Sequence, residues 1–384
     1  MRKGFTIIEL LVVVAIIGLL VAILLPAIGK ARDNAQMTQS QANLRSIGQA
    51  AAIYGSEFQD RQWTACPDDL GTWQGDCARY ANLRCFGQLS LGFDADSVSI
   101  GFFIPLSGRG CTPAPTANCN VGRAYWPCDF SQATGNFGSW RLVNAKSFNK
   151  YVGSSFYADV FYAPKDRMTI EAARPFKEQG TDFAGTLQDA VLSSYTWSPA
   201  AMWSPDVLSS RQPGFQPPNA LPGAFRSPST SQARFSDLKT RVIEHQWLQN
   251  LPSGMDAMTG SKWGSGEANP DSFSPARRQR TMPWYFNEGY MSSPNALFFD
   301  SHVAQLSVQE AVDSDNRVRR QNSSGVGATL AQQGTFFPRG AIGTLPSSYQ
   351  FGTYDNGAFN SGRGCSYHVF TVDGILGRDT VGAK

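Results

Sequence analysis

Residues 5–25 read FTIIELLVVVAIIGLLVAILL, and this stretch decides the architecture of the chain. It holds a single ionisable side chain, Glu9, among apolar residues. At about 1.5 Å per residue, a helix of this length spans roughly 31 Å, the thickness of the hydrocarbon core of a bilayer. Because Arg2 and Lys3 precede it, the positive-inside rule predicts a cytoplasmic N-terminus, with the rest of the chain beyond the membrane.

Two common kinds of membrane segment fit this stretch less well. A secretory signal has a shorter apolar core followed by a cleavage site of small residues, whereas residues 26–30 read PAIGK. A plain anchor leaves Glu9 unexplained, because a carboxylate at the centre of a spanning helix costs about 2.5–3.5 kcal/mol. Such a group normally has a partner, and cleavage between Gly4 and Phe5 creates one, an α-amino group.

Residues 4–13, GFTIIELLVV, closely resemble the signature of type IV prepilins and type II secretion pseudopilins. In that family a membrane peptidase cuts after the Gly and N-methylates the new terminal Phe. The resemblance therefore implies a leader of residues 1–4, cleavage at Gly4 and methylation of Phe5. In a dry bundle of packed helices, Glu9 can neutralise the Phe5 amine of a neighbouring subunit. Removing one partner of a buried pair costs about 3–5 kcal/mol, so we expect this pair to set the register of assembly.

The resemblance implies a structural subunit of a type IV pilus-like filament or a type II secretion pseudopilus, and no enzyme. Such a subunit is a single-pass inner-membrane precursor that a prepilin peptidase/methylase processes. The assembly machinery then polymerises it through its N-terminal helix into a periplasmic or extracellular filament. The alternative is a minor or tip subunit whose large head acts as a binding or adhesion module.

The helical pattern continues beyond the apolar stretch. Pro26 removes one helical hydrogen bond, so we expect a kink there. An amphipathic face follows, with apolar residues at spacings of 3, 4, 3 and 4, namely Leu44, Ile47, Ala51, Tyr54 and Phe58. The pattern predicts one helix over residues 5–58 whose last turns pack on a head, with a separate short helix as the open alternative.

The next region is rich in cysteine. Six of the seven cysteines fall within residues 59–130: Cys66, Cys77, Cys85, Cys111, Cys119 and Cys128. Disulfides persist outside the cytoplasm, so we expect a disulfide-tied, loop-rich part of the head, with Cys365 as the odd one. Several pairings are open to six cysteines, and no Cys or His spacing resembles a metal site.

Residues 131–384 have the pattern of a β-rich globular head. Alternating apolar and polar runs predict antiparallel strands at 155–166, 240–248, 295–308 and 367–377. The Pro- and Ser-rich residues 198–233 predict a long surface loop, and a short helix is possible near 308–312. The predicted fold class is α+β and type IV pilin-like: a long N-terminal helix on an antiparallel sheet, with long loops and disulfides.

A second, downstream resemblance involves residues 295–303, NALFFDSHV. They resemble the C-terminal motif of a large-headed prepilin subfamily, in which a His, nine residues and Asp-Gly follow one another. In this sequence Tyr290 occupies the His position and Ser301 the Gly position.

Motifs of enzymes and of metal sites are missing from the sequence. There is no P-loop, no HExxH, no dinucleotide fingerprint and no nucleophile elbow, and we interpret His245, His302 and His368 as structural. Residues 313–316 alternate oxygen-bearing side chains but lack the Gly and distal Glu of a calcium loop, so they predict a solvated turn. Calcium is the one cofactor hypothesis, because major pseudopilins bind it in a C-terminal loop; otherwise we expect none.

Composition and charge limit the remaining partners. An aromatic content of 12% and a net charge of only +3 exclude a disordered chain and argue against nucleic acid as a partner. The basic clusters at 277–280 and 317–320 are therefore interpreted as solvated or inter-subunit faces.

Overall fold

The protein is described from a computed structural model. The described residues are 6–64, 99–102, 121–125, 143–144, 146–153, 155–178, 193–211, 214, 216, 221–224, 226–244, 293–323, 334–335 and 371–382. All seven cysteines lie outside these ranges, so the predicted disulfides stay predictions. Gly4 and Phe5 also lie outside them.

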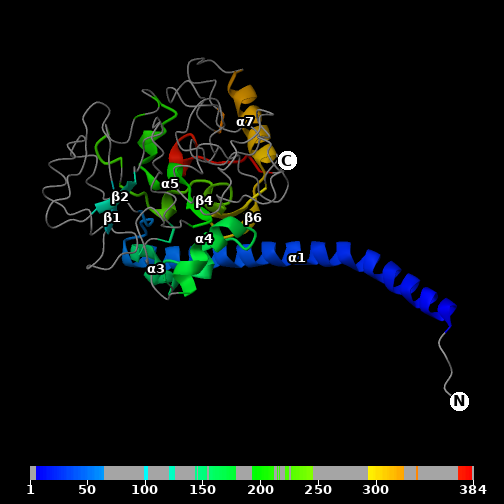
Figure 1. The fold of residues 1–384 in the computed structure, drawn as a ribbon. Helices are drawn as coiled ribbons and strands as arrows, with labels where there is room; N and C mark the ends of the chain where they lie inside the picture. The colour runs from blue at the N-terminus through cyan, green and yellow to red at the C-terminus, as the bar shows by residue number, and fades with distance from the viewer. Residues whose placement is uncertain are drawn as a thin grey trace.

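The predicted long helix is confirmed. Helix α1 spans Ile7–Glu57, with Pro26 inside it. Figure 1 shows α1 as a rod that leaves the head and curves toward its N-terminus, so the helix stays continuous through the proline. After Phe58 the backbone reverses through Gln59 and Asp60, whose φ angles of 56° and 62° are left-handed.

A four-stranded antiparallel sheet forms the centre of the head. Its strands are β3 (Tyr195–Trp197), β4 (Thr240–Glu244), β5 (Asn295–Phe298) and β6 (Val303–Gln305), in that spatial order. Every residue of the first three strands is buried. The strands predicted at 240–248 and 295–308 are thus confirmed over their described parts, and the α+β class is confirmed. Two further strands, β1 (Ser99–Phe102) and β2 (Val121–Tyr125), pair in parallel.

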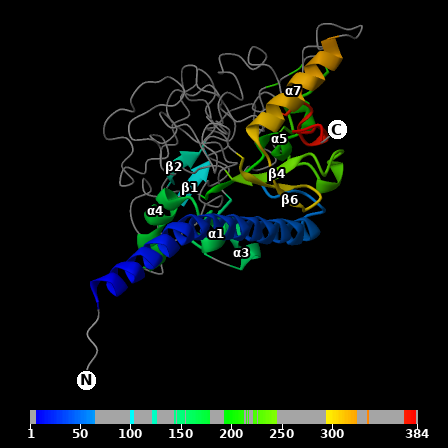
Figure 2. The same cartoon turned by 90° about the vertical axis from the view of Figure 1, so that its right-hand side faces the viewer.

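Helix α1 packs on this sheet through its C-terminal half. Leu44, Ile47 and Ala51 of the predicted apolar face are fully buried. A Cβ on Gly48 would lie 3.0 Å from Cδ2 of Leu297 in β5, so this glycine lets helix and sheet approach closely. Figure 2 shows the sheet between α1 on one side and α5 and α7 on the other.

The remaining helical elements are short or lie on the outside of the head. They are α3 (Lys146–Val152), η4 (Asp159–Phe161), α4 (Arg167–Glu178), α5 (Pro199–Met202), η6 (Pro205–Val207), η7 (Thr230–Gln232), α7 (Val308–Ser323) and η11 (Gly374–Leu376). The last of these packs on α5 and η6, close to the core cluster of Ala201, Phe299 and Ile375.

Three predictions for the head are wrong. Residues 155–166 form turns and η4 and are no strand. Of the strand predicted at 367–377, residues 367–370 lie outside the described ranges, and after a β-bridge position at Thr371 the described remainder forms a turn and η11. Alternating apolar residues here fill the core from tight turns, which periodicity alone does not distinguish from strands. The described residues within 198–233 do not form one surface loop, because prolines begin the helical turns α5 and η6 and several side chains there are buried, among them Met202, Trp203, Val207 and Leu208.

The predicted turn at 313–316 is also wrong, since these residues lie inside α7. Ser314 and Asp315 are buried, and Oδ2 of Asp315 accepts a hydrogen bond from Nε of Arg319 at 2.6 Å. Arg317 donates to the backbone carbonyl of Gly382 at 3.1 Å. Arg317 therefore ties α7 to the C-terminal segment, while Arg319 pairs within α7.

Candidate assembly site

Helix α1 begins with a capping box built from Thr6 and Glu9. The hydroxyl of Thr6 accepts from the backbone N–H of Glu9 at 3.3 Å, and Oε2 of Glu9 accepts from the backbone N–H of Thr6 at 2.9 Å. The Thr6 hydroxyl also donates to the same oxygen at 2.8 Å. These bonds satisfy donors that every helix start leaves without intrahelical partners.

This local role of Glu9 was not predicted from the sequence. The signal was present, because Thr followed three residues later by Glu, ahead of an apolar run, is the sequence signature of a capping box. The bonds hold the Glu9 carboxylate against Thr6, the residue after Phe5. Cleavage after Gly4 would make Phe5 the new N-terminus, so the carboxylate would lie beside it. Capping and pairing with a terminal amine therefore use the same carboxylate.

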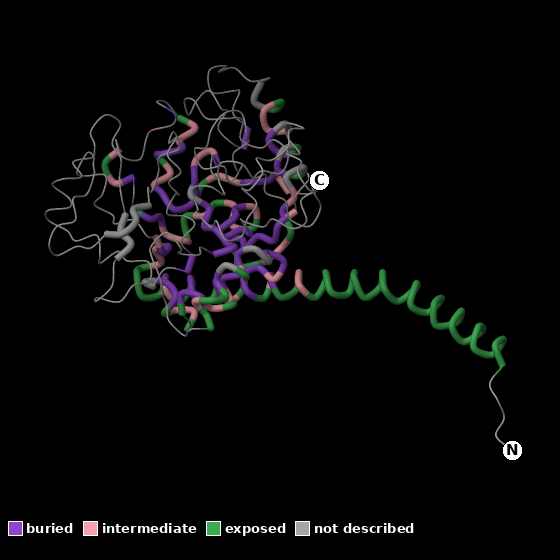
Figure 3. The backbone as a smooth tube through the Cα atoms, viewed as in Figure 1, coloured by how far each residue is buried: buried purple, intermediate pink, exposed green. Residues whose placement is uncertain are grey.

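Apart from the pair of Asp33 with Lys165, no described contact joins the first half of α1 to the rest of the chain. Every residue from 6 to 35 is exposed, as the green part of the tube in Figure 3 shows. The 18-residue window that makes this helix a candidate membrane span has a mean hydropathy of 3.2, and none of it is buried. Exposed apolar surface of this extent requires a membrane or other helices to cover it.

Two glycines in this half have open space around them. A Cβ on Gly18 or Gly29 would meet no atom within 4 Å. Neither glycine is needed for packing within the subunit. Small residues let the backbones of neighbouring helices approach within a membrane or a bundle, which is the setting we expect for this face.

Comparison with known families addresses this same segment. Residues 1–25 match the family model described as the prokaryotic N-terminal methylation motif. They are the signal of type IV prepilins and pseudopilins. No curated protein and no solved structure matches the chain. The large-headed subfamily suggested by residues 295–303 stays a prediction, as do the roles of Gly4, Phe5 and Glu9 within the prepilin signal.

A buried polar seam joins the second half of α1 to the head. Ser40 of α1 donates a short hydrogen bond to Oε1 of Glu244 in β4. The Glu244 carboxylate also accepts from the backbone N–H and the side-chain amide of Asn295, at 2.6 and 3.1 Å. Burial raises the pKa of Glu244 to about 7, although these hydrogen bonds and the charge of Lys165 oppose the rise.

The seam continues along α1 to Asn43 and Tyr195. The Asn43 amide donates to the Tyr162 carbonyl at 3.1 Å and to the Tyr195 hydroxyl at 3.3 Å. The Tyr195 hydroxyl lies 2.9 Å from that of Ser40, and burial, with the charge of Glu244, raises the pKa of Tyr195. Because polar contacts have a preferred geometry, this seam fixes the rotation of α1 on the sheet.

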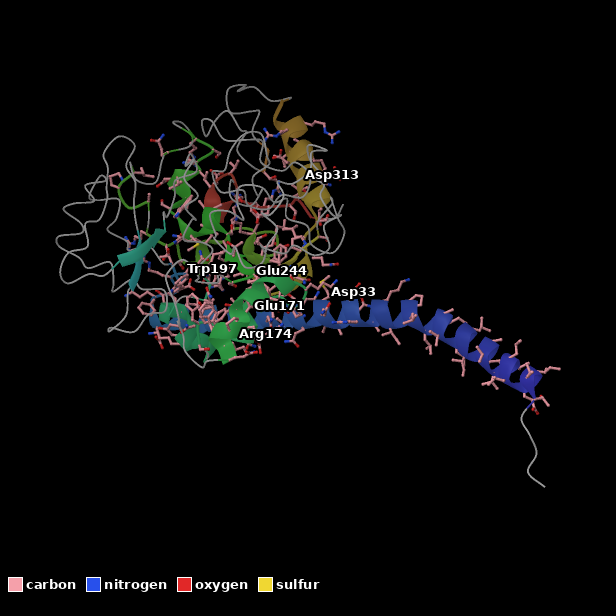
Figure 4. The ribbon with its side chains drawn as sticks, in the orientation of Figure 1. Asp33, Glu171, Arg174, Trp197, Glu244 and Asp313 are labelled. Atoms are coloured by element: carbon pink, nitrogen blue, oxygen red, sulfur yellow. The ribbon has the colours of Figure 1, made fainter. Side chains whose placement is uncertain are left out.

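Two ion pairs lie near the place where α1 leaves the head. Asp33 lies 3.6 Å from Nζ of Lys165, and Figure 4 places Asp33 on α1 at the edge of the head. Glu171 and Arg174 of α4 pair with each other nearby on the outside of the head. Both pairs are at least partly exposed, so we expect little stability from either.

A fully buried ion pair ties the C-terminal segment to the sheet. Nζ of Lys239 lies 3.0 Å from Oδ1 of Asp379, and both side chains are fully buried. Thr371 donates to the same oxygen at 2.6 Å, and Thr240 N–H donates to Oδ2 at 2.8 Å. Burial lowers the pKa of Lys239 while Asp379 raises it, so the pair depends on both partners.

Chemical groups that could hold a metal do not converge in the described ranges. Within them no group of three His, Cys, Asp or Glu side chains is arranged to bind an ion. His302 lies with Nδ1 2.5 Å from Oδ1 of Asp300, in the turn between β5 and β6, and its ring stacks on Phe298. These contacts give His302 a structural role in the turn.

Proposed function

We propose that this protein is a structural subunit of a type IV pilus-like filament or of a secretion pseudopilus. The observation that carries the proposal is the prepilin signal at residues 1–25. The subunit is made as a single-pass inner-membrane precursor with a cytoplasmic N-terminus. A prepilin peptidase cuts between Gly4 and Phe5 and methylates Phe5.

The exposed half of α1, residues 6–35, makes apolar contacts both in the membrane and in the filament. In the membrane its apolar surface faces lipid, and in the filament the same surface faces the helices of neighbouring subunits. The head's contacts with α1 begin at Asp33 and Met37, after the apolar stretch, and the buried contacts begin at Ser40. A subunit can therefore move from membrane to filament without changing the packing of its head.

Glu9 is the residue that selects the register in this proposal. In the filament its carboxylate pairs with the Phe5 amine of a neighbouring subunit, away from water. The pairing adds an intermolecular role to the capping bonds to Thr6, which the single chain already makes.

Two substitutions at Glu9 separate these roles. Glu9→Ala removes the cap and the charge, whereas Glu9→Gln keeps a capping side chain, since Gln also serves in a capping box, but removes the charge. We expect both variants to be cleaved and methylated like the wild type, and both to give few or no filaments. Mass spectrometry of the membrane fraction measures processing, and the yield of sheared filaments measures assembly. Normal filaments from Glu9→Gln would show that the charge pair is not the assembly determinant.

A minor or tip subunit is the second candidate role, and the size of the head beyond residue 58 favours it. Abundance in the sheared fraction distinguishes the two roles. A main structural subunit dominates that fraction, whereas a tip subunit is present in trace amounts and its deletion leaves filaments that lack only its binding activity.

A further inference from the structure

A polar pocket lies where α1 ends, at the opposite end of the helix from the apolar half. Its volume is about 430 Å³, within the range of small-molecule sites. Its described walls come from the turn after α1 (Gln59 and Arg61), from residues 204–205 and from residues 223–232. With 51 residues in α1, roughly 75 Å of helix separates the pocket from the N-terminus, so it lies far from the exposed apolar half.

The wall beside α1 is held by a network around Asp60. The Asp60 carboxylate accepts short hydrogen bonds from the hydroxyls of Ser229 and Thr230, and one from the backbone N–H of Ser231 at 2.9 Å. Burial alone would raise the pKa of Asp60, but these bonds lower it to about 2, so the carboxylate stays charged. Arg61 also pairs with Ser229 through a backbone bridge. The pocket is thus formed before any ligand binds.

Arg61 and Arg226 contribute the positive charges that line the pocket, and the charged Asp60 carboxylate next to Arg61 offsets part of them. Nε of Arg61 donates to the Ser227 carbonyl at 3.2 Å, which holds that guanidinium against the wall. Arg226 is exposed and pairs with no acid in the described chain. None of the described lining residues is acidic. Asp60 and Asp206, which neighbour the walls in sequence, are bonded to Ser229 and Ser204 respectively.

The other lining groups suit hydroxyl-bearing ligands. The amides of Gln59 and Gln232 each offer donors and an acceptor, which is what a sugar hydroxyl needs. Pro205 and Pro228 offer flat carbon surfaces to the C–H face of a ring. None of the described lining residues is aromatic, so this pocket lacks the stacking surface that proteins use for nucleobases.

We propose that this pocket binds an acidic sugar, of the kind found in surface polysaccharides. The ligand's carboxylate pairs with Arg226 and Arg61, since guanidinium groups match carboxylates in charge and geometry. The sugar hydroxyls bond to the two glutamine amides. The inference goes beyond the proposed filament function and does not depend on it, because the pocket belongs to the head of the single chain.

The test measures binding of D-glucuronate to the full chain in a zwitterionic, sugar-free detergent, by saturation-transfer NMR and calorimetry. D-Glucose serves as the neutral match and inorganic phosphate as the simple anion. The variants are Arg226→Gln, which removes a pocket charge, Gln232→Trp, which fills the pocket, and Arg45→Gln. The last removes an exposed arginine of α1 outside the described lining, and it is the matched control. Circular dichroism and tryptophan fluorescence check that every variant is folded.

We expect saturable binding of glucuronate, with glucose and phosphate each at least about tenfold weaker. Arg226→Gln should weaken binding about tenfold or more, because it removes a charge-assisted hydrogen bond, and Gln232→Trp should abolish it. Arg45→Gln should stay within about twofold of the wild type. The proposal is overturned if glucuronate shows no saturable binding, or if folded Arg226→Gln binds it like Arg45→Gln. If glucose bound as tightly as glucuronate, the carboxylate would have no role in binding. If phosphate bound as tightly as glucuronate, the pocket would be a simple anion site. Either result would also overturn the proposal.

Discussion

The two halves of α1 belong to one continuous helix but have opposite surroundings. Residues 6–35 are exposed although they are mostly apolar, whereas the half that packs on the head buries polar residues, Ser40 and Asn43, beside Leu44 and Ile47. No described residue of the head covers the apolar side chains of the first half, whereas the second half packs on the sheet. The same kind of substitution should therefore change assembly in one half and folding in the other.

The largest effect is expected at the very start of the first half. Gly4→Leu should abolish processing, because a side chain at this position keeps the extended peptide from lying close to a peptidase. Intact-protein mass spectrometry should show the uncleaved precursor in the inner membrane, and no filaments should form. Gly29→Ala, which adds a side chain in open space on the same helix, is the control and should be processed normally. Efficient cleavage of Gly4→Leu would contradict the proposed processing site.

A matched pair of leucines tests the difference between the halves. Leu44 is fully buried and Leu20 is 53% exposed. Leu44→Ala should lower the free energy of unfolding of the head by about 2–5 kcal/mol, because it leaves a cavity between α1 and the sheet. Leu20→Ala should change it by less than about 0.5 kcal/mol. Denaturant titration in mild detergent, followed by tryptophan fluorescence, measures both values.

The yield of filaments should show the reverse order, with Leu20 mattering more than Leu44. If Leu20 packs against neighbouring subunits, Leu20→Ala lowers the filament yield although its head is as stable as the wild type. A Leu20→Ala variant that destabilises the head as much as Leu44→Ala would show that the first half packs on its own head.

The buried seam predicts a dependence of stability on pH. The pKa of Glu244 rises from 4.5 to about 7 on folding, so between these values the folded state holds a proton that the unfolded state has released. The contribution of Glu244 to the free energy of unfolding is therefore greatest below pH 4.5. It falls by roughly 3 kcal/mol in all as the pH rises from 4.5 to 7. Asp60 acts in the opposite direction, but only as pH falls from 3.8 toward 2, outside this window.

Glu244→Gln isolates that contribution, because the amide resembles the protonated acid in shape and stays neutral. The amide nitrogen of Gln cannot accept the bonds that one Glu244 oxygen accepts, so we expect the variant to be less stable near pH 4.5. Its stability should change little between pH 4.5 and 8, whereas that of the wild type should fall. Unfolding curves across this range provide the measurement. A fall in stability from pH 5 to 7 that is equally steep in both proteins would show that Glu244 does not titrate in this window.

The contrast between the halves also explains what the sequence could predict. The helix of the first half was predicted, because its length, apolar composition and single acid are local properties of residues 5–25. The capping box of Thr6 and Glu9 was equally local, and only the competing interpretation of Glu9 as an intermolecular group kept it from being predicted.

The second half was predicted only as an apolar stripe. Leu44, Ile47 and Ala51 followed from helical periodicity, but Phe58 is 43% exposed and stacks on Tyr54 at the surface. The bond between Ser40 and Glu244 joins residues 204 positions apart, and no local pattern specifies such a pair. The same holds for the pocket, whose walls come from three separate segments, and for residues 155–166, where tight turns give the alternation of a strand.

The smallest effect concerns how independent the two halves are. Thr6→Val removes the capping hydroxyl and should destabilise the start of α1 by about 1 kcal/mol, so the first turns should exchange their amide hydrogens faster. The effect should stop within those turns, since the seam anchors the helix some thirty residues further along. Hydrogen exchange by mass spectrometry on the full chain compares peptides from residues 7–20 and 40–55. Faster exchange in both peptides would mean that α1 behaves as one cooperative unit, and the division between a half for assembly and a half for the head would then be wrong.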